Sequence, residues 1–137
     1  EYTEEFIISN ELIKKAGKNY IMDIGRFLGG QIDLSEKEKM RSNNIYMSHA
    51  RSLDYEIVLN IPEGYTVSGV ERLSKNVDNL TGGFSSKATI DRAKLFIKIN
   101  KHYKYYYEPS SSWPQMVEFL DDAYQFTQSK ILLKKKV

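Results

Sequence analysis

The sequence predicts a mainly β protein, an antiparallel β-sandwich with a C-terminal amphipathic helix packed on one sheet or edge. Short segments of alternating apolar and polar residues are separated by glycine, proline and asparagine, as in strands joined by turns. From about residue 112 apolar residues recur every three or four positions, which indicates one late helix. A chain of 137 residues has room for one buried core. We therefore expect a single domain over residues 1–137.

The N-terminal part, residues 1–40, is predicted to be a hairpin region. Alternation begins at Tyr2 and continues through residue 8, and two further apolar segments flank Gly17, whose conformational freedom suits a tight reversal. Residues 31–34 are expected to form a short extended piece. Ser35 and Glu38 have the spacing of a capping box, but residues 35–40 are too few and too charged for a stable helix, so we expect a solvated loop.

Residues 41–110 are predicted to supply the core strands. Residues 45–47 resume extended structure, and the clearest strand follows at residues 53–61, where apolar residues occupy every second position. Pro62 and Gly64 then force a hairpin turn or a corner between sheets, and Tyr65 restarts an extended run. Residues 76–91 are interpreted as two short strands about Gly82 and Gly83.

The last core strand is expected to run from residue 94 to residue 107, after a turn at residues 91–93. Leu95, Ile97 and Ile99 share one face of this strand, and the tyrosines at 103, 105 and 107 continue the same parity. This pattern predicts that the strand leaves the core at its tyrosine end.

The helix is predicted over residues 112–129, with residues 130–137 as a terminal strand and a lysine tail. Ser112 and Gln115 have capping-box spacing, and Pro114 belongs in a first turn, so either Ser112 or Trp113 is the expected cap. The predicted buried stripe contains Met116, Val117, Phe119, Leu120, Ala123, Tyr124 and Phe126. Asp121 and Asp122 are expected on the solvated side.

Composition excludes several classes of function. With 41% hydrophobic and 28% charged residues, no apolar run reaches the ~20 residues of a membrane span. A net charge of +2 with interleaved signs argues against a nucleic-acid partner. The absence of cysteine removes disulfides, thiolate nucleophiles and thiolate metal sites. The chain begins at Glu1, so we expect an excised piece of a longer protein.

No catalytic, cofactor-binding or metal-binding residues are predicted. The serines at 110–112 lie beside prolines at a helix start and fit capping better than a nucleophile elbow. His49 and His102 have no acid or histidine at a recognised ligand spacing, so a place on the surface or at a strand end is favoured for both.

The richest cluster of candidate residues is aromatic. Two interpretations stay open: the rings anchor an interface or stack on a ligand, or they are ordinary strand residues, with the tryptophan filling space between helix and sheet. The candidate interaction surface comprises His102, Tyr103, Tyr105, Tyr106, Tyr107 and Trp113.

The order and spacing of several motifs over about residue 41 to the end resemble a known arrangement. These motifs are YEIVLNIPEGYTV at residues 55–67, Gly83-Phe84, Leu95-Phe96-Ile97, and Trp113-Pro114 opening a helix that runs into KILLK at residues 130–134. They are similar to the C-terminal β-sandwich of uncharacterised Bacteroidetes-type proteins with an upstream transglutaminase-like domain. The resemblance implies an exported protein, periplasmic or at the cell surface, whose catalytic residues lie outside this chain.

The expected function is therefore a non-catalytic accessory module that packs on or orients the adjoining transglutaminase-like domain, or that contacts a protein or glycan ligand. The alternative is a carbohydrate-binding β-sandwich domain that uses the aromatic surface. The tyrosine strand, rather than the lysines at 134–136, is the expected contact surface.

Overall fold

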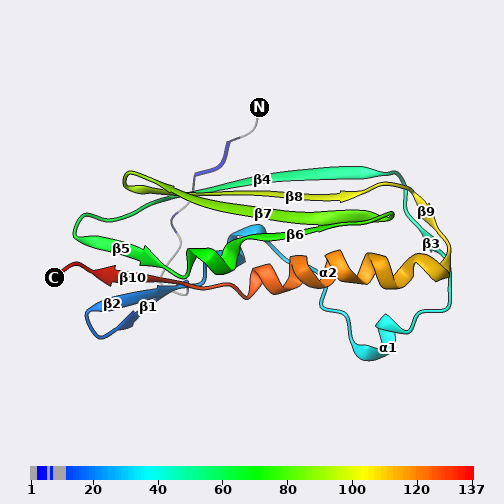
Figure 1. The fold of residues 1–137 in the computed structure, drawn as a ribbon, viewed down its shortest axis with the longest axis horizontal. Coiled ribbons are helices and arrows are strands. Elements are labelled where there is room, and N and C mark those ends of the chain that lie inside the picture. Colours follow the sequence, from blue (N-terminus) through cyan, green and yellow to red (C-terminus); the bar gives the residue numbers. More distant parts are fainter. Residues whose placement is uncertain (1–2, 6, 8–11) are drawn as a thin grey trace.

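The computed structural model describes residues 3–5, 7 and 12–137, and in this part of the chain antiparallel sheets and a C-terminal helix make up the fold (Figure 1). The long sheet has the order β4-β8-β7-β6 and consists of β4 (Arg51–Asn60), β8 (Lys94–Tyr103), β7 (Gly82–Asp91) and β6 (Lys75–Asp78). The terminal sheet has the order β1-β2-β10-β5 and consists of β1 (Ile13–Ala16), β2 (Asn19–Met22), β10 (Ile131–Lys135) and β5 (Tyr65–Ser68). A small ribbon pairs β3 (Ile45–Tyr46) with β9 (Tyr107–Glu108).

Helix α2 (Trp113–Thr127) is the predicted C-terminal helix, and it is longer than the other helical elements. The others are α1 (Glu36–Lys39) and the 3-10 turns η1 (Ile24–Leu28), η2 (Val70–Leu73) and η3 (Ser110–Ser112). The predicted class, mainly antiparallel β with a late helix, is confirmed. None of the helices in the described residues is both long and apolar enough to cross a membrane.

The long sheet has one apolar face because the neighbouring strands β4 and β8 place their alternating residues in register. Ile57 on β4 lies opposite Ile97 on β8, and the pairs two residues away on either side, Tyr55 with Ile99 and Leu59 with Leu95, lie on the same face. Leu95, Ile97 and Ile99 are buried, whereas the matching positions of β4 are half-buried because β4 lies at the sheet edge. The predicted alternation in both strands is confirmed.

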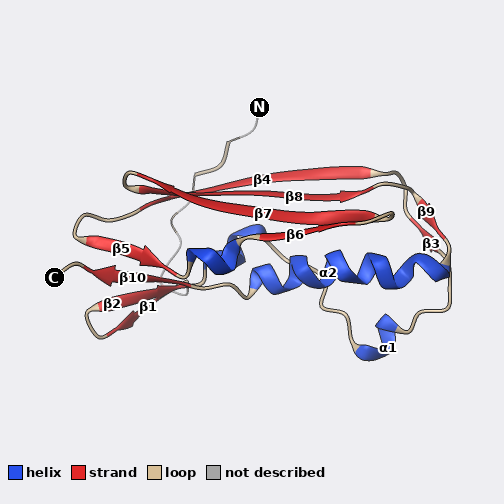
Figure 2. Ribbon diagram, viewed as in Figure 1, coloured by secondary structure: helices blue, strands red, loops and turns tan. Residues whose placement is uncertain are grey.

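Helix α2 lies along this apolar face, and Figure 2 shows the terminal sheet on the same side of the long sheet, beyond the end of the helix. Its buried stripe includes Phe119, Leu120, Ala123 and Phe126, and the Phe126 ring lies 6.0 Å from the ring of Phe84 on β7. The helix start differs from the prediction. Ser112 is helical in backbone conformation and makes no side-chain cap bond, because an N-cap side chain needs an extended backbone to reach back.

The turn after β4 is a corner between sheets. Strand β5 pairs with β10, with Val67 opposite Leu133, and therefore belongs to the terminal sheet. Gly64 has φ +79°, which supplies the reversal, and its carbonyl accepts a hydrogen bond from the Lys136 N–H at 2.8 Å. Lys134 and Lys135 also belong to β10, so the predicted lysine tail is shorter than expected.

The predicted glycine turn at Gly82 and Gly83 is wrong. Both residues lie inside β7, and the reversal between β6 and β7 falls at residues 79–81, where the Asn79 side chain accepts from the Thr81 N–H at 3.0 Å. An added Cβ on Gly82 would lie 2.2 Å from the His102 carbonyl oxygen. These glycines allow neighbouring strands to approach closely, and they do not form a turn.

The N-terminal predictions have mixed outcomes. The hairpin β1–β2 is confirmed, with Gly17 at φ +63° in its turn, but the alternation from Tyr2 to residue 8 lies largely outside the described residues. Residues 31–34 form no strand. The expected loop at residues 35–40 contains α1, a single turn with the full capping box between Ser35 and Glu38.

Candidate interaction surface

The strand that was predicted to continue to residue 107 ends at Tyr103. The Lys104 N–H donates to the Thr81 carbonyl at 2.9 Å, and after a bend the Tyr106 carbonyl accepts from the Met47 N–H at 2.7 Å. The chain thus leaves β8 and joins the β3–β9 ribbon, so the prediction of one parity from residue 95 to residue 107 is wrong.

Four tyrosine side chains gather around this bend, and we call them the tyrosine cluster: Tyr46, Tyr105, Tyr106 and Tyr107. Tyr105 is 58% exposed, Tyr106 62% and Tyr46 74%. The Tyr46 and Tyr107 rings lie 4.9 Å apart because β3 and β9 place them opposite each other. The sequence contained Tyr46 in an extended segment, but only the pairing of β3 with β9 brings it beside residues 60 positions away.

Two of the predicted surface residues are structural instead. Trp113 is only 5% exposed, and its Nε1–H donates to the Glu38 carbonyl at 2.9 Å, which ties α1 to the start of α2. Tyr103 is half-buried, and its ring meets Phe119 edge-on at 5.3 Å. The open interpretation of Trp113 as a space-filling residue is the one that the structure favours, so neither ring belongs to the exposed surface.

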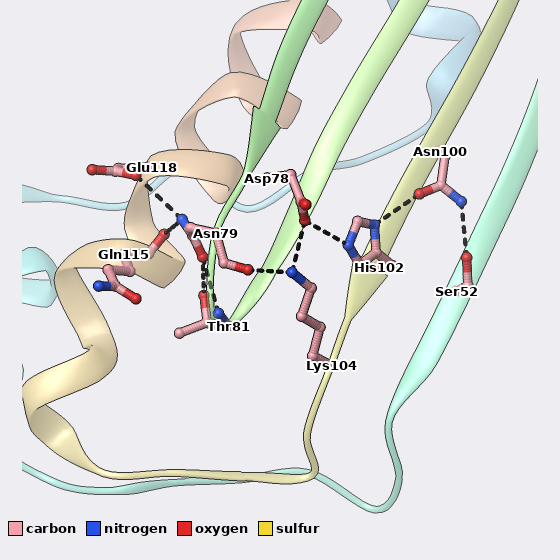
Figure 3. A network of polar contacts seen from close by, with 9 residues as sticks. All are labelled: Ser52, Asp78, Asn79, Thr81, Asn100, His102, Lys104, Gln115 and Glu118. Atoms are coloured by element: carbon pink, nitrogen blue, oxygen red, sulfur yellow. Dashed lines mark hydrogen bonds and ion pairs between the residues drawn. The ribbon is translucent and has the colours of Figure 1, made fainter.

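The remaining predicted residue, His102, lies on the opposite face of the long sheet from the core, in a polar network (Figure 3). Its Nδ1 lies 2.8 Å from Asn100 Oδ1, and its Nε2 lies 3.2 Å from Asp78 Oδ1. To reach Asp78, which is two strands away, the imidazole passes over Gly83. An added Cβ on Gly83 would lie 2.8 Å from the His102 Cε1 atom, so this contact depends on the glycine.

Both ring nitrogens of His102 face oxygen acceptors. The Asn100 Nδ2 group donates to Ser52 Oγ and Asp54 Oδ1, each at 2.8 Å, which directs the Asn100 oxygen toward the imidazole. A neutral imidazole donates through only one nitrogen, so the two contacts are hydrogen bonds together only when both nitrogens carry a proton. Through His102 and Asn100, Asp78 is thus connected to Ser52 on β4.

Lys104 connects this network to the tyrosine bend. Its Nζ lies 2.9 Å from Asp78 Oδ1 and also donates to the Asn79 carbonyl. The lysine ammonium, and after it His102, holds the pKa of the Asp78 carboxyl below its ordinary value. The Asn79 side chain in turn donates to the Gln115 carbonyl at 2.7 Å and to Glu118 at 3.2 Å, so the β6–β7 turn is joined to α2.

The chemistry of the network does not match a serine hydrolase. Ser52 Oγ accepts from Asn100, and both ring nitrogens of His102 face other residues, so this imidazole is not placed to activate the Ser52 hydroxyl. His49 is exposed and has its Nδ1 2.9 Å from Ser48 Oγ. Within residues 3–5, 7 and 12–137, no three His, Asp or Glu side chains are grouped so that they could hold a metal ion.

Two further features adjoin these residues. The outer face of the long sheet carries an open hollow of about 740 Å³ whose polar lining includes Asp54, Asn76, Ser85, Lys98 and Asn100. Glu108, next to Tyr107 in β9, is buried, and its Oε1 has no hydrogen-bond partner among the described residues.

Comparisons of the chain with protein-family models, with curated proteins and with solved structures found no match.

Proposed function

We propose that this domain is a non-catalytic interaction module and that the tyrosine cluster is its contact surface. The main supporting observation is that the four tyrosines of the cluster are exposed around one bend of the chain. Backbone hydrogen bonds to Thr81 and Met47 hold this bend in place. Tyrosine side chains have few rotatable bonds and combine an apolar ring with a polar tip, so they lose little entropy when a partner covers them.

The partner in this proposal is an adjoining transglutaminase-like domain of the same exported protein, as the motif resemblance implies. Rigid presentation of the rings supports such a role, because a preformed surface binds with a smaller ordering cost than a mobile one. The polar network contributes by joining Lys104, at the start of the bend, to the β6–β7 turn and through Asn79 to α2.

Contacts made by the tyrosines and contacts made by the lysines can be tested separately, because the tyrosine bend at β9 and the C-terminal lysines lie at opposite ends of the molecule (Figure 1). The transglutaminase-like domain would be expressed separately, and its binding to the present chain measured by calorimetry. Replacing Tyr105 and Tyr106 together by alanine is expected to cost more than ~2 kcal/mol of binding free energy. Replacing Lys134, Lys135 and Lys136 by alanine is expected to cost less than ~0.5 kcal/mol.

Each variant must first show the circular dichroism and thermal transition of the parent. A larger loss for the lysine variant, shrinking with added salt, would show that the contact is electrostatic and would refute the proposal. A parent protein without any transglutaminase-like domain would refute the proposed partner.

A second candidate function, carbohydrate binding, is supported by the hollow on the outer face of the long sheet. Its lining offers carboxylate, amide, hydroxyl and ammonium groups, the donors and acceptors that a polyhydroxylated ligand needs, close to the network that contains His102. Soluble oligosaccharides would be titrated against the chain, with Asn100→Ala as the variant that removes a group from the hollow. Binding that Asn100→Ala abolishes and the tyrosine double variant leaves intact would favour this function over the first.

A further inference from the structure

One long edge of the molecule has no strand partner in the described residues. Strand β4 pairs with β8 over its whole length, and β4 is the last strand of the long sheet on that side. Proteins usually shorten, bend or cover such an edge, because a row of unpaired N–H and C=O groups recruits other strands. A regular, unpaired edge of ten residues is therefore a candidate binding surface for another strand.

The register shows which residues present their backbone groups to this edge. The Ile61 N–H donates to the Ala93 carbonyl at 2.7 Å, which continues the β4–β8 ladder past the end of both strands. Hydrogen-bonding direction alternates along an antiparallel strand, so the odd-numbered residues of β4 pair with β8. The outward groups belong to the even-numbered residues Ser52, Asp54, Glu56, Val58 and Asn60.

An apolar hollow runs beside this edge. It has a volume of about 280 Å³, and its lining combines Met22, Ile24 and Phe27 with residues 56–59 of β4. Consecutive β4 residues point to alternate faces, so a lining made by four in a row places the hollow at the strand edge rather than under one face. Phe27 and Val58 are both exposed there.

We propose that β4 is a docking site for an extended peptide strand, which pairs with the free edge and inserts apolar side chains into the hollow. In this kind of strand addition, main-chain hydrogen bonds provide the affinity, and pockets for every second side chain of the peptide provide the specificity. On the outer face the edge strand itself carries Asp54 and Glu56, while Lys98 lies opposite Glu56 on the inner neighbour β8. The partner strand that would meet the two acids directly is therefore one that alternates apolar residues with lysine or arginine.

A second copy of this chain does not fit the same edge. Antiparallel pairing of β4 with itself, in the registers of greatest overlap, puts Asp54 opposite Glu56, or else one of these two acids opposite its own copy. Like charges directly opposite each other destabilise strand pairing. The charge pattern therefore favours a basic partner strand over self-association.

The test uses two fluorescein-labelled peptides as probes, one alternating valine with lysine and one alternating valine with glutamate. Fluorescence anisotropy is expected to show binding of the lysine peptide only. Glu56→Lys is expected to weaken the lysine peptide by about tenfold and to allow the glutamate peptide to bind.

A backbone variant tests pairing directly. Val58→Pro removes an outward N–H and leaves the β8 ladder intact, and it is expected to weaken the lysine peptide by about fivefold or more relative to Val58→Ala, which keeps that N–H. Hydrogen exchange followed by NMR is expected to show new protection at the amides of Asp54, Glu56 and Val58 when the peptide binds. The tyrosine double variant is expected to bind the peptide as the parent does, so this result is independent of the tyrosine cluster.

Absence of lysine-peptide binding, equal binding by Val58→Pro and Val58→Ala, or protection at sites other than β4 would each overturn the proposal. Concentration-dependent dimerisation that blocks peptide binding, and that Val58→Pro weakens relative to Val58→Ala, would assign the edge to a second copy instead.

Discussion

Replacing Leu120 by alanine tests whether the contact between α2 and the long sheet holds this fold together. Leu120 is 5% exposed and lies on the buried stripe of α2 between Phe119 and Ala123. The variant loses the transfer free energy of the removed groups and leaves a cavity that the surrounding side chains fill only in part. We expect the free energy of unfolding to fall by about 2–5 kcal/mol, a large fraction of what a small domain has.

The measurement is urea unfolding followed by circular dichroism, with Gln125→Ala as the control, since Gln125 is exposed on the same helix. With a slope of about 2 kcal/mol per M, the midpoint of Leu120→Ala is expected to fall by about 1–2.5 M, while the control stays within about 0.25 M of the parent. A loss below about 1 kcal/mol, or one equal to that of Gln125→Ala, would refute the view that α2 is part of the core.

Two further predictions concern the polar network. Gly83→Ala is expected to lower the free energy of unfolding by about 1–3 kcal/mol, because the new Cβ would lie 2.5 Å from the Val77 carbonyl oxygen and 2.8 Å from the His102 ring. Gly30→Ala enters open space and should change the free energy of unfolding by less than about 0.5 kcal/mol, and equal effects of the two variants in urea unfolding would contradict the argument. Because Lys104 lowers the folded-state pKa of Asp78 below its ordinary value of 3.8, the ion pair stabilises the protein above that pH and this stabilisation is lost as the pH falls through the folded-state pKa. The Tm difference between the parent and Asp78→Asn should therefore shrink as the pH falls below about 4, and a difference that grows there would show the opposite sign.

The candidate surface was only partly predictable from the sequence. The concentration of rings at residues 102–113 was visible, and Tyr105, Tyr106 and Tyr107 are exposed. The assignment of Trp113 and Tyr103 to the same surface failed because aromatic residues serve cores and surfaces equally well, and burial depends on what packs against them. The polar network could not be read from the sequence, because its members come from three strands, a turn and helix α2, and no local pattern specifies how these elements are aligned.

Local periodicity by itself determined the regular elements with strong patterns. The alternation at residues 53–61 specified β4, and the three- and four-residue spacing specified α2, because a buried face at the wrong period would expose apolar side chains to water. The capping-box spacing of Ser35 and Glu38 was also visible, since its hydrogen bonds join residues three apart, but the helical turn α1 was predicted as a loop.

Only the tertiary structure decided how these elements pair. Pro62 and Gly64 allow a hairpin or a corner with the same backbone geometry, and β10, about 65 residues later, provides the partner that draws β5 into the terminal sheet. Likewise the chain leaves β8 after Tyr103 and joins the β3–β9 ribbon, where the Tyr106 carbonyl accepts from the Met47 N–H, about 60 residues earlier in the sequence. Strand partners and the residues that end a strand are set by hydrogen bonds between distant segments. These bonds form only when the sheets assemble, so no local sequence pattern specifies them.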